Sequence, residues 1–319
     1  MTQPASTFAA ETSPLEVLPR DISAYRQGNT GIDYVHRFAS GRPGPHVLVN
    51  ALTHGNEICG MVAATHLLDA GVRPKIGTLT VSFAHVEAYN AFDIERPYEN
   101  RQLVHNLNRI WSADMLDGTQ QSPELRRARE LRPVLDAADY MLDIHSTRAP
   151  VQPFWVYPEF ERNAGLALAV GHPLVHLVMP VGAAPGTGVT GYGRHGQAGI
   201  DGGAVVVECG QHFSQSAADL ATDVSLRFLA HLGLVDSLPE AAAPAQPARR
   251  FRLLEVHMVQ SDSFAFARPV IGFEVFGKGE LIATDAGREI RSPCDGCTIF
   301  MPTRAPVVGR EGVYLTIAV

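Results

Sequence analysis

The residues best suited to chemistry follow apolar runs typical of β-strands, at the points where these runs end. His54 and Glu57 stand three positions apart, directly after one such run. Residues i and i+3 share a face in the first turn of a helix, so this imidazole and this carboxylate can hold one ion. Taken alone, the pair is more typical of helix-cap residues than of metal ligands.

A second histidine, His145, ends the apolar run 140–144. With His54 and Glu57 it completes the ligand set of a catalytic zinc, which leaves a fourth position for water. Asp143 precedes His145 and is available to hydrogen-bond it. We expect alternation along the strand to point Asp143 to the opposite face, so it is assigned no role. The sequence thus predicts one Zn²⁺ per chain.

A third polar residue, Glu208, follows three β-branched residues, Val205 to Val207. Buried strands seldom end in Glu without a reason, and ligands of open α/β sheets bind beyond the carboxyl ends of the strands. Because His54, His145 and Glu208 all occupy such ends, we expect one shared site. Glu208 is then a candidate general base that takes a proton from the attacking water and later protonates the leaving amine. The alternative is a salt-bridge partner.

Three residues of the irregular segment 98–111 are suited to an anionic substrate, namely Arg101, Asn108 and Arg109. One guanidinium can hold a carboxylate through two parallel hydrogen bonds. Another can stabilise the oxyanion that forms when an amide is attacked. The alternative is that both arginines are ordinary surface residues.

The hydrophobic pattern supplies the elements that must position these residues. The predicted strands of this half are 31–39, 46–52, 79–86, 140–144 and 204–207, and the predicted helices are 57–70, 123–138 and 216–232. Their alternation predicts an α/β sheet. The connection 87–121 is predicted to be irregular, and a structureless connection of this length is usually functional.

The composition predicts a soluble globular protein. Of 319 residues, 45% are hydrophobic and 18% charged, which excludes collagen, coiled coils and fully disordered chains. A formal net charge of −7 argues against a nucleic-acid partner. The sequence has four scattered cysteines and no signal peptide in residues 1–20, which predicts a cytoplasmic protein. His and Pro residues interrupt the most apolar stretch, 164–185, so no membrane span is predicted.

The composition changes abruptly near residue 239. The segment 239–247 is rich in Pro and Ala and has no core pattern, which is typical of a linker. Short strands separated by Gly, Pro and Asp follow it. We therefore predict a catalytic domain at 1–238, a linker at 239–248 and an all-β module at 249–319.

Four motifs in order, HGNE, NLNR, DIHST and VVVECG, resemble the succinylglutamate desuccinylase and aspartoacylase family of the zinc-carboxypeptidase superfamily. The resemblance covers 47–210, and the β module after the catalytic domain also looks like the family layout. It implies a zinc-carboxypeptidase-like mixed sheet flanked by helices. It also implies that His54, Glu57 and His145 bind zinc and that Glu208 is the catalytic acid and base.

The same resemblance implies roles for the polar segment. Arg101 matches the arginine that polarises the scissile carbonyl, and Asn108 and Arg109 match the pair that grips the α-carboxylate of the substrate. The family often has an acidic residue where this chain has Asn106. We therefore expect the substrate pocket to differ in charge.

The contacts that aspartoacylases make with the aspartate side chain have no secure counterpart in this sequence. Arg148 and Arg194 are only candidates for them. Amino acids with an N-acyl group other than N-acetylaspartate are therefore candidate substrates, including an acylated diamino acid such as N-acetyl-diaminobutyrate, whose deacetylases resemble the same family.

Three other motifs receive no catalytic role. The pattern GTGVTG at 186–191 is not followed by a helix, so a glycine loop near the site is expected instead of a dinucleotide site. Cys294 and Cys297 lack the second pair that a four-ligand zinc site needs. His212, four residues beyond Glu208, either lines the pocket or is incidental.

Together these features predict a zinc-dependent hydrolase that cleaves the amide bond of a small anionic N-acyl amino acid. No nucleic-acid or membrane partner is expected, and a homo-oligomer is plausible only by analogy. One rival is a metallocarboxypeptidase acting on peptides, which would use the same zinc ligands and the same Arg109. The other is a catalytically silent protein that binds a carboxylated metabolite.

Overall fold

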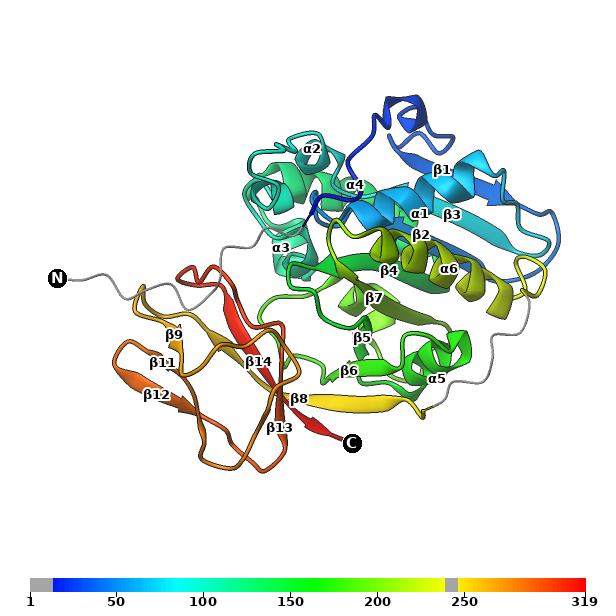
Figure 1. Ribbon diagram of the computed structural model, residues 1–319. Helices are drawn as coiled ribbons and strands as arrows, with labels where there is room; N and C mark the ends of the chain where they lie inside the picture. Colours follow the sequence, from blue (N-terminus) through cyan, green and yellow to red (C-terminus); the bar gives the residue numbers. More distant parts are fainter. Residues whose placement is uncertain (1–13, 239–245) are drawn as a thin grey trace.

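The computed structural model describes residues 14–238 and 246–319, in which one mixed sheet of eleven strands forms the centre of the molecule (Figure 1). Helices cover both faces of its N-terminal half, and a separate three-stranded sheet lies in the C-terminal part. Most of the predicted linker, 239–245, falls outside the described residues, as does the segment 1–13.

The large sheet has the strand order β1-β3-β2-β4-β7-β5-β6-β8-β14-β13-β10. Its first seven strands are β1 (Val35–Ala39), β3 (Thr78–Phe83), β2 (His46–Ala51), β4 (Tyr140–Thr147), β7 (Gly203–Gln211), β5 (Phe154–Pro158) and β6 (Val175–Met179). Strands β3, β2, β4 and β7 run parallel, while β5 is antiparallel to β7. The carboxyl ends of β2, β4 and β7 therefore lie at one edge of the sheet, where the predicted site residues stand.

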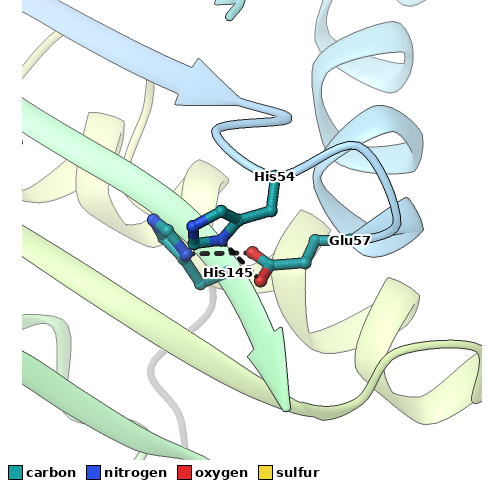
Figure 2. Close-up of side chains that lie close together, drawn as sticks. All are labelled: His54, Glu57 and His145. Atoms are coloured by element: carbon teal, nitrogen blue, oxygen red, sulfur yellow. Dashed lines mark hydrogen bonds and ion pairs between the residues drawn. The ribbon is translucent and has the colours of Figure 1, made fainter. Parts of the chain in front are cut away.

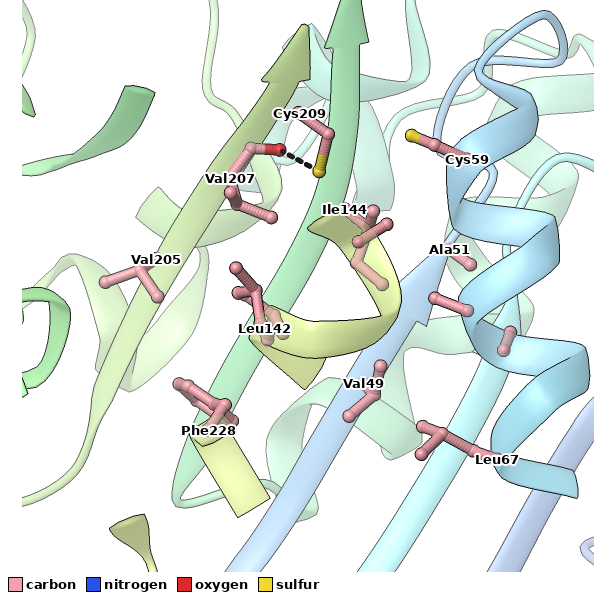
Figure 3. Packing of buried hydrophobic residues seen from close by; sticks show 14 of the residues in the cluster. Val49, Ala51, Cys59, Leu67, Leu142, Ile144, Val205, Val207, Cys209 and Phe228 are labelled. Atoms are coloured by element: carbon pink, nitrogen blue, oxygen red, sulfur yellow. Dashed lines mark hydrogen bonds between the residues drawn. The ribbon is translucent and has the colours of Figure 1, made fainter. Parts of the chain in front are cut away.

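Helices on the two faces bury two separate hydrophobic cores. The α-helices are α1 (Ile58–Asp69), α2 (Val86–Tyr89), α3 (Ala113–Asp117), α4 (Pro123–Ala137), α5 (Glu161–Val170) and α6 (Gln215–His231). Figure 3 shows the face under α1 and α6, with labelled side chains Val49, Ala51, Cys59, Leu67, Leu142, Ile144, Val205, Val207, Cys209 and Phe228. Helix α4 covers the opposite face with its own apolar side. Each fully buried Val, Leu or Phe side chain stabilises the fold by about 1.5–3 kcal/mol.

Strand alternation decides which residues reach the site. On β4, Leu142 and Ile144 face α1 and α6, whereas Met141 faces α4. Because the side-chain period of a strand is two, Asp143 and His145 share the face of Met141. By the same rule, Glu208 of β7 lies on the α4 side of the sheet.

The C-terminal part extends the large sheet instead of standing apart from it. Strand β8 (Arg249–Met258) pairs with β6, and antiparallel pairing then adds β14 (Glu311–Ala318), β13 (Cys297–Phe300) and β10 (Val275–Phe276). Three short strands form the second sheet: β9 (Ala265–Phe266), β11 (Leu281–Asp285) and β12 (Arg288–Arg291). The predicted fold class, a mixed α/β sheet flanked by helices with a small C-terminal β module, is confirmed.

Most predicted elements form, with shifted ends. The first strand begins only at Val35, and the strand predicted for 79–86 ends at Phe83 because α2 begins at Val86. The irregular connection contains α3 and two short 3-10 helices, Glu99–Arg101 and Leu107–Arg109. Elements β5, α5 and β6 were not predicted. Within the described residues, no helix has the length and apolar character needed to cross a membrane.

Candidate metal centre and active site

Two histidines and one glutamate meet where β2 and β4 end (Figure 2). Nδ1 of His54 lies 2.7 Å from Oε1 of Glu57, and Nδ1 of His145 lies 2.9 Å from Oε2 of Glu57. The potential ligand atoms all lie within 4.8 Å of one another, and the three side chains are buried. Among residues 14–238 and 246–319, this is the only such group of His, Cys, Asp or Glu. The sequence-predicted zinc ligands thus converge.

The far nitrogen of each imidazole has a partner that fixes the ring. His54 Nε2 donates to Asn106 Oδ1 at 2.9 Å, and His145 Nε2 donates to Asp143 Oδ2 at 2.5 Å. Both Nδ1 atoms therefore face Glu57. The expectation that Asp143 points away was wrong, because it stands two residues before His145 and shares its face. Asn106 contacts a histidine and is not among the residues that line the cavities described below.

The pKa values in this cluster reflect burial and charge. Burial lowers the pKa of His54 to about 4. Burial also lowers the pKa of His145, but the carboxylates of Asp143 and Glu57 outweigh it and raise that pKa well above its ordinary value. Burial raises the pKa of Glu57, yet the two histidines hold it well below the ordinary value. The cluster thus favours an ionised glutamate.

Glu208 lies beside this cluster. It pairs in register with His145 across β4 and β7. Burial is the main cause that raises its pKa to about 8; the charge of His145 lowers it and that of Glu57 raises it. Its Oε2 is buried and has no hydrogen-bond partner among the described residues. A carboxyl group with one buried oxygen and a raised pKa, beside a possible metal site, is suited to exchange protons.

Arg101 reaches the same point from the irregular connection. Its Nη1 donates to Glu57 Oε1 at 2.9 Å. Its backbone carbonyl accepts a hydrogen bond from Gly55, where an added Cβ would lie 2.4 Å from the carbonyl oxygen of Asn100. Only glycine fits between the two segments, so the loop that carries His54 and Glu57 packs directly against the segment that carries Arg101.

Glu124, in the first turn of α4, anchors that segment. Its buried carboxylate accepts hydrogen bonds from the backbone N–H groups of Leu103 (2.7 Å) and Val104 (2.9 Å), and His85 Nε2 lies 3.1 Å away. Burial raises the pKa of Glu124, but the backbone N–H groups outweigh it and lower the pKa to about 2. Glu124 therefore holds the backbone next to Arg101 through its negative charge.

We expect Glu124→Gln to lower the free energy of unfolding at pH 7 by about 1–3 kcal/mol, because the neutral amide is a weaker acceptor. The folded-state pKa is depressed, so the carboxylate stabilises the fold above pH 4.5 and loses this effect as the pH falls towards 2. Urea unfolding of both proteins at several pH values measures the difference, which should shrink on acidification. A difference independent of pH would contradict this role.

Asn108 and Arg109 lie close by, and several of their polar atoms already have partners. Arg109 Nε donates to Glu311 Oε1 at 2.8 Å, Nη2 to the Tyr314 hydroxyl at 2.9 Å, and Nη1 to the Asn108 carbonyl at 2.7 Å. Asn108 Oδ1 accepts from the backbone N–H of Val189. The C-terminal strand β14 thus contributes directly to the site, which no local sequence signal indicated.

Two cavities meet at the candidate centre. The first, of about 440 Å³, is lined by β5, β6, β7 and the glycine-rich loop 182–191. The second, of about 650 Å³, is lined by the segments 98–103, 146–151, 271–273 and 301–311. Residues that line both are Arg101, Glu208, Met301 and Glu311. A substrate that spans both would present its middle to Arg101 and Glu208.

The remaining sequence candidates are distributed around these cavities. Loop 186–191 lines the first cavity, as predicted, and an added Cβ at Gly186 would lie 2.5 Å from the Arg109 carbonyl oxygen. His212 lines the second cavity, where its Nδ1 lies 2.8 Å from the Ser146 hydroxyl. Arg194 pairs with Asp139 and is not among the residues that line either cavity.

Comparison with known proteins identifies the family. Residues 43–232 match the "Succinylglutamate desuccinylase/Aspartoacylase catalytic domain" family. No curated protein matches the chain at a significant level. The branch that acts on N-acetyl-diaminobutyrate remains a prediction.

Solved structures share the fold at low sequence identity. A succinylglutamate desuccinylase from Vibrio parahaemolyticus is 20% identical, with a TM-score of 0.67 over 90% of this chain and 86% of that one. The enzyme of the same name from Vibrio cholerae is 17% identical, with a TM-score of 0.69 over 89% and 85%. A product-bound ectoine utilization protein, EutE (DoeB), from Ruegeria pomeroyi is 17% identical, with a TM-score of 0.62 over 89% and 88%. The chain therefore belongs to the succinylglutamate desuccinylase/aspartoacylase family.

Proposed function

We propose that this protein is a zinc-dependent deacylase that hydrolyses the amide bond of a small N-acyl amino acid. The observation that carries the proposal is the convergence of His54, Glu57 and His145 with Arg101 and Glu208, in a chain of a deacylase family. Residues that could bind a metal, a carboxyl group suited to proton transfer and a guanidinium group all line one or both of the two cavities. These are the groups that hydrolysis of an amide requires.

The residues present fit a zinc ion. Two imidazole nitrogens and a carboxylate are the ligands of many catalytic zinc sites, which keep a further position open. Glu57 Oε2 is buried and forms no hydrogen bond of correct geometry, so a cation would satisfy it. When bound, zinc acts as a Lewis acid that polarises the acyl carbonyl and makes a water molecule more acidic.

The side chains of this protein would transfer the proton, stabilise the developing negative charge and bind the substrate. In its ionised form, Glu208 accepts the proton of the attacking water and then passes it to the leaving amine nitrogen. Arg101 donates N–H groups to the acyl oxygen as it gains negative charge. Arg109 binds the α-carboxylate of the substrate and Asn108 donates its side-chain amide to it. These two place the amino-acid part in the first cavity and the acyl group towards the second.

Metal content and turnover test the proposal together. Elemental analysis of the purified protein should find about one zinc per chain. Hydrolysis of a panel of N-acetyl, N-succinyl and N-formyl amino acids should disappear with a chelator and return with zinc. A protein without metal that stays inactive after zinc addition would instead be a silent binding protein.

A carboxypeptidase would use the same centre on peptides. The C-terminal module argues against this alternative, since Met301, Glu311 and Tyr314 close one side of the first cavity. Comparison of an N-blocked dipeptide with the corresponding N-acetyl amino acid separates the two activities. Faster hydrolysis of the dipeptide would favour the carboxypeptidase.

The partner of His54 gives a test of the metal site that does not depend on turnover. Asn106 is neutral, whereas the partner of His145 is a carboxylate. Partners of this kind typically change metal affinity 10–100-fold. We expect Asn106→Ala to weaken zinc binding by about this factor and Asn106→Asp to strengthen it, as measured by competition with a chromogenic chelator. Unchanged affinity in Asn106→Ala would mean that this hydrogen bond does not support the ligand.

A further inference from the structure

The first cavity has an apolar wall on three adjacent strands. Val156 of β5 pairs in register with Val206 of β7, and Met179 lies on the neighbouring strand β6. All three line the cavity, and Val181 and Pro180 continue the same wall. Arg109 lines the same cavity, so a substrate whose α-carboxylate is held there has this wall available to its side chain.

The positively charged side chains that line the first cavity already form ion pairs or hydrogen bonds with protein groups. Among its described lining residues the only Lys or Arg side chains are Arg101 and Arg109, and Arg101 pairs with Glu57. Arg109 has five N–H donors, of which three are used by Glu311, Tyr314 and Asn108. One N–H remains on each terminal nitrogen, which is enough for one carboxylate bound through two parallel bonds. With Arg101 on the acyl oxygen and Arg109 on the α-carboxylate, a second substrate carboxylate would find no further Lys or Arg side chain among the described lining residues and would meet Glu208 and Glu311.

Arg148 and Arg194, the two other arginines that the sequence suggested for substrate binding, add no cation to the first cavity. Arg148 lines the second cavity, where its guanidinium lies 4.3 Å from the ring centroid of Tyr98. Arg194 donates to Asp139 at 2.8 Å and is not a lining residue of the first cavity. Neither is placed to receive an acidic side chain there.

We propose that this cavity selects an uncharged, apolar amino-acid side chain, so that the substrates are N-acyl derivatives of residues such as leucine or methionine instead of aspartate or glutamate. This inference rests on the proposed deacylase function. An unpaired carboxylate against Val156, Val206 and Met179 would lose its hydration without a compensating partner. One methylene group in a hydrophobic pocket is worth about 10–200-fold in kcat/KM, and the cost of burying the charge adds to this difference.

Leucine and aspartate side chains have similar size and differ in charge, so they form a matched substrate pair. We expect kcat/KM for N-acetyl-leucine to exceed that for N-acetyl-aspartate by at least about 100-fold. The N-succinyl derivatives should show the same preference for leucine over aspartate. Met179→Arg places a cation in the cavity and should shift this ratio towards aspartate by about 10-fold or more. Met179→Gln, which has similar length and no charge, is the control and should shift it less.

The outcomes separate this inference from the function on which it rests. A wild-type enzyme that prefers N-acetyl-aspartate overturns the apolar pocket and leaves the deacylase intact. Absence of turnover across the whole panel overturns the deacylase. Calorimetry on the zinc-loaded protein then measures the affinities for free leucine and free aspartate. Tighter binding of leucine supports an apolar pocket, and equal or tighter binding of aspartate overturns it.

Discussion

Replacement of Glu208 by glutamine is expected to lower kcat by about two to four orders of magnitude, the usual contribution of a general base. The amide has the shape of the carboxylate but cannot accept the proton of the attacking water. Glu208 is outside the group of possible metal ligands, so the variant should keep its metal and its fold. The change therefore isolates proton transfer from metal binding.

Initial rates on the best substrate, together with elemental analysis of the same samples, measure this effect. Glu255→Gln is a matched control, because Glu255 is an exposed glutamate of β8 that lines neither cavity. A normal rate in Glu208→Gln would refute the assignment. Loss of metal from the variant would make Glu208 a ligand instead of a base.

The fold could be predicted where the hydrophobic pattern is long and regular. Helices 123–138 and 216–232 were placed to within one residue at each end because caps and 3.6-residue periodicity agree there. The short strands β5 and β6 and helix α5 were missed. They occupy about five to ten residues each within a stretch broken by Pro and His, where apolar runs fit a strand or a helix equally well.

The same distinction applies to the site. The residues that follow strands, His54, His145 and Glu208, could be predicted, because parallel strands bring their carboxyl ends to one edge. Asp143 could also have been assigned, since residues i and i+2 share a strand face. Glu311 could not, because it lies about 200 residues from Arg109 and no local pattern indicates which surface the C-terminal strand meets.

The C-terminal module therefore contributes residues to the site, and its own sequence contains no pattern that predicts this. Strand β8 continues the large sheet, and this fixes β14 beside the first cavity. Glu311 and Tyr314 then hold two of the nitrogens of Arg109 and orient the remaining donors. Burial raises the pKa of Tyr314, so it stays a neutral donor and acceptor at physiological pH.

Replacement of Arg101 by alanine is expected to lower kcat by about 10²–10³-fold with a smaller change in KM, because its donors stabilise charge that develops only in the transition state. The side chain lies at the junction of the two cavities, where the amide of a substrate spanning both would be held. Arg101→Lys keeps the charge but not the planar fork of donors, so it should recover only part of the rate.

Arg101 also donates to Glu57, so the measurement must separate transition-state stabilisation from metal binding. Zinc content and chelator competition are determined on the same variants, and kcat is compared only between samples with full occupancy. Guanidinium ion added to Arg101→Ala should restore part of kcat, since it can enter the space left by the side chain, whereas the wild-type enzyme should gain nothing. If KM rises while kcat stays unchanged, Arg101 binds the ground state and the oxyanion must be stabilised by another group.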